Sequence, residues 1–460
     1  MNNILMIACR GRKMYDVILI GGGPGGYKTA ELCKKRGLSV ALIEKEALGG
    51  TCLNQGCIPF KTYLHVAKNK HEAEKKTKME LLSCSRMTIN QERLLKYKNS
   101  VVNGLQQSVK VMLQSCGVDY FEGKGDVVSR DDKQIIVETG SGRIEGKNLV
   151  IATGSEEKRI PIPDNLPYKV MYSKEMLEQS LIPDNVIIIG GGVIGLEAAS
   201  FYADSGCEVT IIEAAEHLGG HIDEEIASAI EQILEKKGIS VKTNTYIKGL
   251  DFDGVVCDHF GKSQVINSQC VLIAIGREPY MDTCSLDKLG VTYDKKGVII
   301  DDSCRTNMNN VYACGDVTGK MMLAHTAYYQ AKVITDNICG KHSKIDYSFI
   351  PRIIYANPEI LSVGVCEDEC EGTQYTAKCL PMTYSGRYYA ENGKDGAKAK
   401  MIVNEKCEII GFHMIGNGAS EISLAAEMMI RSKMKVEDIR NLVFAHPTYV
   451  EIISELAGLF

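Results

Sequence analysis

The pattern of apolar and polar residues predicts one structural unit that occurs twice along the chain. Apolar residues 14–20 lead into a glycine-rich segment, a helix is expected over 27–35, and a second apolar run over 38–43 ends at Glu44. About 169 residues later the same order recurs, with apolar residues 185–189, a glycine-rich segment, a helix and an apolar run over 208–212 that ends at Glu213. Two unrelated turns would not share this layout, so we predict two dinucleotide-binding units.

The glycines of each unit follow the G-x-G-x-x-G spacing. The first glycine permits a tight turn, the second lets the backbone approach a pyrophosphate, and the third lets helix and strand pack closely. The helix that follows offers free N–H groups to the phosphates, and the terminal acid can accept hydrogen bonds from ribose hydroxyls. These positions are Gly21, Gly23 and Gly26 in the first unit and Gly190, Gly192 and Gly195 in the second.

The residues after Glu213 bear on the choice between NAD and NADP. A carboxylate repels the 2′-phosphate of NADP, and Ala214 and Ala215 stand where an arginine would be needed to bind it. We therefore expect the second unit to prefer NAD. The alternative is that Glu213 is an ordinary exposed strand end.

The rest of the chain predicts further strands, a pair of helices and a last domain. Residues 68–115 are lysine-rich with apolar residues at helical spacing, which indicates a solvated helical pair. Runs over 148–154, 271–276 and 311–316 resemble later strands of the two units, and the last brings Asp316 to the C-terminal edge of a sheet. After Tyr347, alternating strands over 397–415 and then amphipathic helices indicate a separate domain.

Composition and charge exclude several classes of protein. Hydrophobic residues are 45% and charged residues 24%, as in ordinary globular proteins. No apolar run reaches the roughly 18 residues that span a bilayer, and a net charge of −5 without a basic stripe argues against nucleic acid. Residues 1–13 place their charges after a short apolar patch, unlike a secretory signal. We therefore interpret them as an extension or as a misplaced start before Met14, and expect a reducing, cytoplasmic location.

Two of the seventeen cysteines, Cys52 and Cys57, carry candidate chemistry. On an ideal helix, residues five apart lie about 140° from each other and cannot bond without distortion. Gly56 and Pro59 would permit an irregular helix start, where thiolates are stabilised and exchange with disulfides quickly. The alternatives are two buried free thiols or half of a metal site, although metal sites usually have tighter spacing and a second pair. We expect most of the other cysteines, such as Cys33 and Cys207, to be small core residues.

The chain resembles the dihydrolipoamide dehydrogenase family of flavin disulfide reductases (class I pyridine nucleotide-disulfide oxidoreductases). The active-site motif of that family matches Cys52-Leu-Asn-Gln-Gly-Cys57-Ile-Pro-Phe-Lys61, and segments 152–154, 276–277, 315–316, 322–325, 357–359 and 446–451 fall in family order. The resemblance implies an α/β fold of two Rossmann-like domains, for FAD and NAD, plus a C-terminal α+β dimerisation domain. The implied divisions are an N-terminal extension (1–13), a FAD-binding domain (14–155 and 281–346), an NAD-binding domain (156–280) and an interface domain (347–460).

The same resemblance assigns residues to each cofactor and no residue to a metal. Lys61 and Glu197 match the pair that lies beside the reactive flavin nitrogen. The FAD positions beyond the glycines are Glu44, on the adenosine ribose, Asp316, on the flavin side chain, and Thr153, Gly154, Ser155, Met322, Leu323, Ala324 and His325. The NAD positions beyond the glycines are Glu213, Ile247 and Gly276.

The implied reaction is the oxidation of dihydrolipoamide by a Cys52–Cys57 disulfide, with FAD passing the electrons to NAD. Cys52 would form the mixed disulfide and Cys57 would face the flavin. His446 would act as the base, with Glu451 fixing its tautomer. In relatives this histidine comes from the partner subunit, which implies a homodimer. The implied partners are lipoyl-carrying proteins of a 2-oxoacid dehydrogenase complex or of a glycine-cleavage or glycine-reducing system.

One residue departs from the family pattern, and several alternatives stay open. Phe60 stands where relatives usually carry serine, which puts the rate and the redox tuning in doubt. Mercuric reductase and the long thioredoxin reductases need a further C-terminal redox pair, which this sequence lacks, and Glu213 argues against the NADPH-dependent glutathione-type reductases. A related reductase with another disulfide substrate is one alternative. A non-catalytic flavoprotein would require the loss of Cys52, Cys57 or His446, and all three are present.

Overall fold

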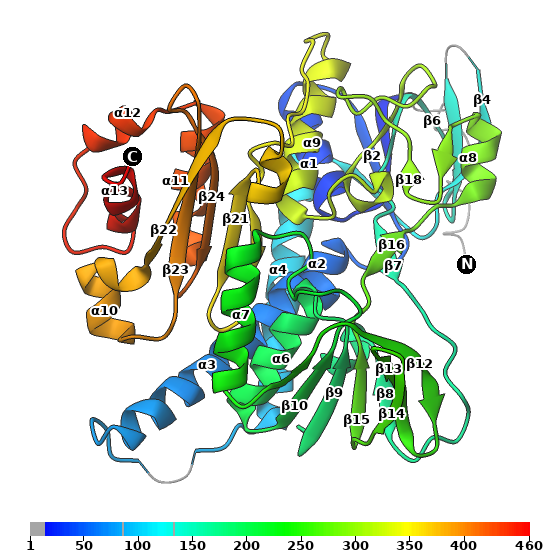
Figure 1. Cartoon of the computed structure of the whole chain (residues 1–460). Helices are drawn as coiled ribbons and strands as arrows, with labels where there is room; N and C mark the ends of the chain where they lie inside the picture. Colours follow the sequence, from blue (N-terminus) through cyan, green and yellow to red (C-terminus); the bar gives the residue numbers. More distant parts are fainter. Residues whose placement is uncertain (1–13, 85–86, 132–133) are drawn as a thin grey trace. The chain divides into compact units, whose positions relative to one another are not determined.

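A computed structural model of the chain describes residues 14–84, 87–131 and 134–460, so the predicted extension over 1–13 lies outside the described residues. The chain forms two compact units, each assembled from segments that are distant in the sequence (Figure 1). Unit 1 holds the residues up to Pro59 together with Tyr97–Lys158 and Arg277–Ile345. Unit 2 holds Phe60–Lys96, Arg159–Gly276 and Asp346–Phe460. The predicted domain boundaries at 155, 280 and 346 stay predictions.

Unit 1 is built on a seven-stranded sheet with a parallel core in the order β3-β2-β1-β6-β19. The predicted apolar runs form its central strands because a parallel sheet is buried on both faces. Helices α1 and α9 pack against each other. The parallel strands are β1 (Met14–Ile20), β2 (Val40–Glu44), β3 (Asp119–Glu122), β6 (Gly142–Ile151) and β19 (Val311–Ala313), and the antiparallel edge is β4 (Asp126–Arg130) and β5 (Ile135–Thr139). The unit also contains α1 (Pro24–Lys35), α2 (Gly50–Gln55), α8 (Thr283–Leu289), η1 (Gly315–Thr318), α9 (Ala324–Ile338), and the paired short strands β7 (Ser155–Glu157) with β16 (Arg277–Pro279) and β17 (Tyr293–Asp294) with β18 (Gly297–Val298).

Unit 2 contains a second parallel sheet, in the order β11-β10-β9-β15-β8. With β9 in the place of β1, the order β11-β10-β9-β15 repeats the order β3-β2-β1-β6 of unit 1, and the predicted recurrence of strand, turn, helix and strand is confirmed. The fifth strand differs, because β8 precedes β9 in the chain whereas β19 follows β6. The strands are β8 (Lys169–Met171), β9 (Asn185–Ile189), β10 (Glu208–Ile212), β11 (Ser240–Lys242) and β15 (Cys270–Ile273), with an antiparallel sheet of β12 (Thr245–Asp251), β13 (Gly254–His259) and β14 (Lys262–Ile266). The helices of this part are α5 (Ser173–Met176), α6 (Val193–Ser205) and α7 (Glu224–Lys236).

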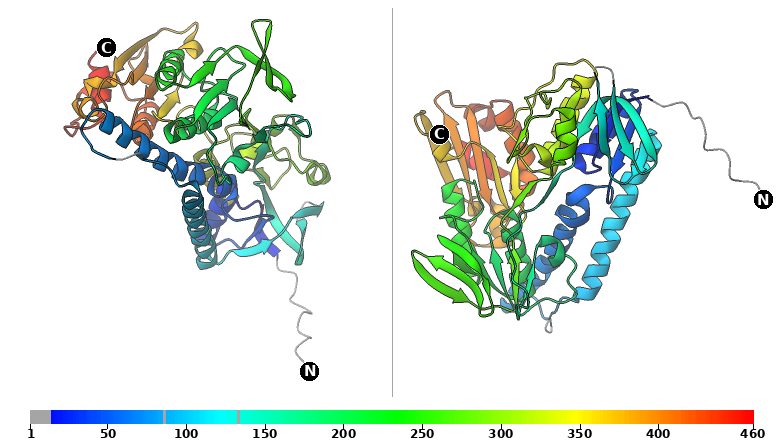
Figure 2. Two further views of the ribbon diagram at one scale, coloured as in Figure 1. Left: turned by 90° about the horizontal axis from the view of Figure 1, so that it is seen from below. Right: turned by 90° about the vertical axis from the view of Figure 1, so that its right-hand side faces the viewer.

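The C-terminal part of unit 2 is an antiparallel sheet in the order β20-β21-β24-β23-β22, on which α11 packs against β21 and β24 (Figure 2). The alternating strands predicted over 397–415 are therefore confirmed, and so is the mixed α/β class. The strands are β20 (Arg352–Ile354), β21 (Ile360–Gly364), β22 (Tyr375–Pro381), β23 (Lys398–Asn404) and β24 (Ile409–Ile415). The helical segments are η2 (Glu367–Cys370), η3 (Met382–Tyr384), α10 (Gly386–Asn392), α11 (Ala419–Arg431), α12 (Val436–Arg440) and α13 (Glu451–Ala457).

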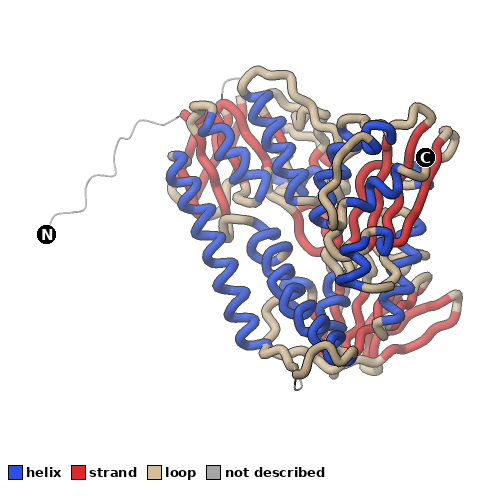
Figure 3. The backbone as a smooth tube through the Cα atoms, turned by 90° about the vertical axis from the view of Figure 1, so that its left-hand side faces the viewer, coloured by secondary structure: helices blue, strands red, loops and turns tan. Residues whose placement is uncertain are grey.

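The predicted helical pair is present as α3 (Cys57–Lys78) and α4 (Gln91–Cys116), the two longest helices of the described chain (Figure 3). The first begins earlier than its lysine-rich part suggested, because its opening turns are apolar. Phe60, Tyr63 and Leu64 are buried in the main core cluster of unit 2. Within the ranges that the structure describes, no helix is both long and apolar enough to cross a bilayer.

Candidate active site

The first glycine turn has no room for side chains inside it, but open space lies in front of α1. Gly21 has φ +110°, and a Cβ there would lie 2.1 Å from the carbonyl oxygen of Ala152. A Cβ on Gly26 would lie 1.8 Å from the carbonyl oxygen of Gly21. At Gly23, which caps α1, a Cβ would meet only the Cα of Gly50, at 3.6 Å. A phosphate fits there, against the free N–H groups of the helix.

The second glycine turn repeats this geometry at α6. Gly190 has φ +106°, and its Cβ would lie 2.4 Å from the carbonyl oxygen of Ala274. A Cβ on Gly195 would lie 1.9 Å from the carbonyl oxygen of Gly190. Gly192 caps α6, and nothing lies within 4 Å of the position that a Cβ would take. The space beside Gly192 is the cradle that a pyrophosphate would fill.

The two strand-end acids are held by their backbones in the same way. Glu44 accepts the N–H of Gly22 on Oε2 at 2.6 Å and the N–H of Glu46 on Oε1 at 2.8 Å. Glu213 accepts the N–H of Gly191 on Oε2 at 2.6 Å and the N–H of Ala215 on Oε1 at 2.8 Å. Each carboxylate oxygen keeps a second lone pair, so both acids can still accept ribose hydroxyls.

The predicted FAD positions after β6 form a connected polar chain in unit 1. The Ser155 hydroxyl donates to Oδ2 of Asp316 at 2.6 Å, and Nε of Arg277 donates to the Ser155 hydroxyl at 2.8 Å. Thr153 donates to the carbonyl oxygen of Tyr280 at 2.7 Å. Burial raises the pKa of Asp316, although Ser155 and Arg277 partly offset this effect. Arg277 belongs to segment 276–277, which falls in family order, but no local pattern indicates that it fixes Ser155.

The remaining cofactor positions lie at element ends. Gly154 and Gly276 have φ +77° and +103°, and open space surrounds both. Ile247 lies on β12, whose first residue, Thr245, donates its N–H to the carbonyl oxygen of Glu213 at 2.9 Å. The segment over 322–325 leads into α9, with Leu323 as the residue that caps it. The cofactor roles of these residues stay predictions.

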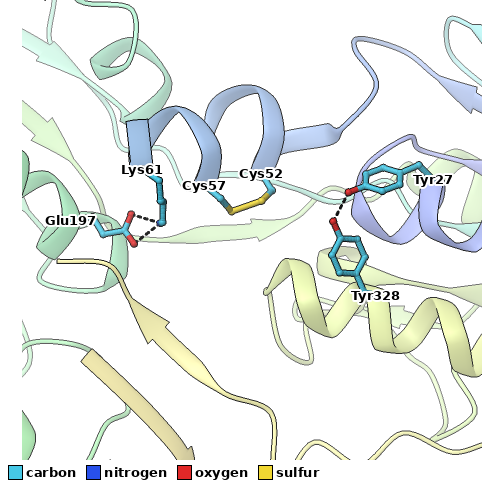
Figure 4. Close-up of a disulfide and its surroundings, with 6 residues drawn as sticks. All are labelled: Tyr27, Cys52, Cys57, Lys61, Glu197 and Tyr328. Carbon is cyan, nitrogen blue, oxygen red and sulfur yellow. Dashed lines mark hydrogen bonds and ion pairs between the residues drawn. A yellow bond between two sulfur atoms is a disulfide. The ribbon is translucent and has the colours of Figure 1, made fainter. Parts of the chain in front are cut away.

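The two candidate redox cysteines form a disulfide where α2 ends and α3 begins (Figure 4). Gly56, between the helices, has φ −144° and ψ −112°, so the ideal-helix angle does not apply, and the Cα atoms lie 4.6 Å apart. A Cβ on Gly56 would approach the carbonyl oxygen of Thr51 to 2.9 Å, closer than real Cβ atoms come. Gly56 therefore permits the predicted irregular helix start, and the bond excludes the alternatives of free thiols and a metal half-site at this pair.

The other cysteines that the structure describes are free, and most of them are buried. Burial raises the pKa of the Cys33 thiol to about 11 and that of Cys207 to about 12. Thiols of this kind stay protonated at neutral pH and react slowly. The prediction that most cysteines are core residues is confirmed, with Cys84, Cys284, Cys339 and Cys407 as exposed exceptions.

Lys61 and Glu197 form a close ion pair within unit 2 (Figure 4). Nζ of Lys61 lies 2.7 Å and 2.9 Å from the two carboxylate oxygens, and the Glu197 side chain is 6% exposed. Tyr355, absent from the sequence analysis, fixes both partners. Its N–H donates to Oε1 of Glu197 at 3.1 Å, and its ring lies 4.3 Å from Nζ of Lys61. The pair thus has a defined position rather than being two independent surface charges.

His446 and Glu451 form the predicted pair at the start of α13. Nδ1 of His446 lies 2.8 Å from Oε1 of Glu451, and the N–H of Thr448 donates to Oε2 at 2.7 Å. The hydrogen bonds from Thr448 and His446 lower the pKa of Glu451. The carboxylate therefore remains ionised and holds the imidazole by Nδ1. With a side chain that is 77% exposed, His446 presents its other face outward.

Two family models of known proteins together match most of the chain. The family model described as pyridine nucleotide-disulphide oxidoreductase matches residues 15–331, and the model of the dimerisation domain of that family matches residues 350–457. The chain is 34% identical over 455 residues to the mitochondrial dihydrolipoyl dehydrogenase of Pisum sativum, covering 96% of this chain and 90% of the relative. It is also 34% identical to the leghemoglobin reductase of Glycine max, covering 96% and 87%.

Among solved structures, the HOCl-induced flavoprotein disulfide reductase RclA from Escherichia coli is similar over almost its full length. The TM-score is 0.83 at 26% identity, with 97% of this chain and 100% of that chain covered. These similarities extend over both glycine turns, the disulfide and the C-terminal sheet. They identify the fold described above as that of flavoprotein disulfide reductases.

Proposed function

Because the chain belongs to the pyridine nucleotide-disulphide oxidoreductase family, we propose that it oxidises protein-bound dihydrolipoamide to lipoamide and reduces NAD+ to NADH. Members of the family depend on FAD and NAD(P) and react through a redox disulfide. The observation that carries the proposal is the Cys52–Cys57 disulfide at the start of α3. The curated relative from Pisum sativum, named a dihydrolipoyl dehydrogenase, supports the choice of substrate.

Thiol–disulfide exchange at Cys52 opens the reaction. One substrate thiolate attacks the Cys52 sulfur, the Cys52–Cys57 bond breaks, and Cys57 leaves as a thiolate. The second substrate thiolate then attacks the mixed disulfide, which closes the lipoamide ring and leaves Cys52 as a thiolate. The substrate has lost two electrons and two protons, and the cysteine pair has gained the electrons. FAD, held by the turn at Gly23, by Glu44 and by Asp316, would supply a two-electron carrier between the reduced cysteine pair and NAD+. The hydride gained by NAD+ would combine these two electrons with one of the two substrate protons.

His446, whose Nδ1 is held by Glu451, accepts the two substrate protons one at a time. One of them ends in NADH and the other is released to solvent. The carboxylate fixes the tautomer and stabilises the imidazolium as the proton arrives. The match to a dimerisation domain supports a homodimer. We infer that the exposed face of His446 serves the disulfide of the partner subunit.

The structure offers fitting residues for both cofactors. The turn at Gly23 with Glu44 would bind the adenosine diphosphate of FAD, and Asp316 would bind its flavin side chain. The turn at Gly192 with Glu213 would bind NAD. Lys61, oriented by Glu197 and Tyr355, would hold a positive charge for the reduced cofactor.

The identity of the substrate and of the protein that carries it is a separate part of the proposal. The leghemoglobin reductase of Glycine max is as similar to this chain as the Pisum sativum enzyme, so reduction of a different partner is the second candidate. We propose a lipoyl-carrying protein of a 2-oxoacid dehydrogenase complex or of a glycine-cleavage or glycine-reducing system as the partner, and a cytoplasmic location.

A steady-state assay separates these possibilities. Purified protein with a flavin spectrum should reduce NAD+ with dihydrolipoamide, and Cys52→Ser should abolish turnover while FAD stays bound. Cys84→Ser, which changes an exposed free cysteine, is the matched control and should keep full activity. Turnover in Cys52→Ser would refute the role of the disulfide. Faster reduction of a different disulfide than of lipoamide would refute the substrate.

A further inference from the structure

Three potential metal ligands from two separate segments meet in unit 2, away from both glycine turns and from the disulfide in the sequence. His221 belongs to the loop over 214–222 that joins β10 to α7, and Cys366 and Glu369 lie at η2, after β21. One ligand atom of each residue lies within 4.8 Å of the other two. His221 and Cys366 lie 145 positions apart in the chain, so no local motif in the sequence marks them as a pair of ligands.

The hydrogen bonds around η2 hold two of these ligands in place. The N–H of Cys366 donates to Oε2 of Glu369 at 2.9 Å, and the Cys366 sulfur in turn accepts the N–H of Glu369. Nε2 of His221 lies 3.1 Å from Oε1 of Glu369. In a tetrahedral zinc site, ligand atoms are about 3.5 Å apart, given zinc–ligand bonds of about 2.0–2.3 Å. Ligand atoms at most 4.8 Å apart therefore need to approach each other by no more than about 1.3 Å, which the exposed side chains can supply.

One of the three ligands is buried and two are exposed, as expected for a site that an ion can reach from solvent. Cys366 is fully buried, whereas the side chains of His221 and Glu369 are 52% and 40% exposed. An ion could therefore enter from solvent between the two exposed ligands and reach the sulfur behind them. The fourth position would face water, which leaves a coordination of three protein ligands and one solvent molecule.

The charges near the site accommodate a divalent cation. Burial raises the pKa of the Cys366 thiol to about 12, so the thiol is protonated without metal. A bound divalent ion displaces this proton to solvent, and the thiolate and the carboxylate together then neutralise the ion. The nearby ammonium of Lys400 is already matched by Asp223, at 2.9 Å, and by Glu367. Arg352 opposes cation binding, but its guanidinium donates to the carbonyl oxygen of His221 at 3.3 Å and so also supports the loop.

We propose that His221, Cys366 and Glu369 form a zinc site that fastens the loop over 214–222 to η2. Zinc fits because it accepts sulfur, imidazole nitrogen and carboxylate oxygen together. The loop starts directly after Glu213 and ends before Asp223, which caps α7 by accepting the N–H of Glu225 at 3.1 Å. Zinc would thus brace the segment that carries the proposed NAD ribose ligand.

Metal titration of the oxidised holoenzyme tests the site, because the Cys52–Cys57 thiols are then unavailable to the metal. After removal of metals by a chelator, Co2+ should bind with one equivalent per chain and give a thiolate-to-cobalt charge-transfer absorption, which Zn2+ should displace. His221→Ala and Cys366→Ser should each weaken Zn2+ binding at least tenfold. The matched controls are His217→Ala, in the same loop, and Cys370→Ser, in η2, and both should bind like the unaltered protein.

Several outcomes of the titration would overturn the proposed zinc site. Cobalt bound without charge-transfer absorption, or absorption that survives in Cys366→Ser, would overturn the assignment, and so would an equal loss of affinity in the control variants. If Cys366→Ser does not fold, His221→Ala decides the matter, since the exposed His221 side chain contributes little to the core. Zn2+ should also raise the melting temperature of the unaltered protein and not that of His221→Ala.

Discussion

The preference for NAD over NADP should depend on the single charge of Glu213. Backbone N–H groups fix both of its oxygens, so the carboxylate cannot turn away from a 2′-phosphate. At about 5 Å and an effective dielectric constant of about 20, two unit charges repel by about 3 kcal/mol. Physiological salt roughly halves this energy. A phosphate with one to two charges is then disfavoured by about 2–3 kcal/mol, or about 30- to 150-fold.

Glu213→Gln removes the repulsion and keeps the shape of the side chain. We expect kcat/KM for NADP+ to rise by up to about 30- to 150-fold, the factor that corresponds to the lost repulsion. We expect kcat/KM for NAD+ to fall about fivefold, since a hydrogen bond to a charged acceptor becomes a neutral one. The amide NH2 would also face an N–H group of Gly191 or Ala215 and loosen the loop. That loss affects both cofactors alike, so the ratio of the two kcat/KM values is the quantity to measure.

The first glycine unit supplies the matched control. Glu44 has the same two backbone hydrogen bonds as Glu213. Glu44→Gln should therefore weaken retention of FAD, measured by flavin release on dilution, and leave the ratio for the two nicotinamide cofactors unchanged. A ratio in Glu213→Gln within twofold of the unaltered enzyme would refute the electrostatic reasoning, and so would an equal change in Glu44→Gln.

Three further outcomes follow from the structure. Gly192→Ala should fold normally but lose NAD affinity, because its Cβ enters the open space that the pyrophosphate would fill. Gly195→Ala should lower the melting temperature strongly, because its Cβ would lie 1.9 Å from a carbonyl oxygen. Equal melting temperatures of the two variants would contradict this reasoning. Glu451→Gln should lower kcat at least tenfold, whereas the control Glu455→Gln should not. Hydrogen bonds lower the pKa of Glu451 from its usual 4.5, so its pairing with His446 is complete above about pH 5 and is lost only as the pH falls through the lowered pKa. An NMR titration of the Glu451 carboxyl would show this. Phe60→Ser should reduce the free energy of unfolding by about 3 kcal/mol or more, since the ring is 3% exposed in the core, and a loss below 1 kcal/mol, measured by denaturant unfolding, would argue against a packing role.

The parts of the fold that sequence could predict are those set by local regularity. The apolar runs of β1 and β9, the glycine spacing and the strand-end acids repeat over short windows and carry their own steric reasons. The lysines of α3 mark only its exposed turns, so the lysine-rich segment alone does not show where the helix begins. That start is indicated by Gly56 and Pro59, and the apolar residues that follow, Phe60 and Tyr63, are buried.

The contacts that complete the site were not predictable, because they join residues far apart in the chain. Tyr355 binds Glu197 across 158 positions, and Arg277 binds Ser155 across 122. No pattern in a local window encodes such a contact, which exists only after the sheets have assembled. The resemblance to a family could supply Lys61 and Glu197 as a pair, but not the tyrosine that holds them.

The two glycine turns also limit how the cofactor choice of this chain can evolve. Steric exclusion allows no side chain at the inner glycines, and the backbone N–H groups fix the orientation of the two acids. The freedom that remains lies in the residues directly after each acid, Lys45 and Glu46 in one unit and Ala214 and Ala215 in the other. Lys45 already has a specific neighbour, because its Nζ lies 3.8 Å from the ring centre of Tyr280. Glu213 and the two alanines that follow it therefore form a small mutational target through which selection could redirect this enzyme to another nicotinamide pool.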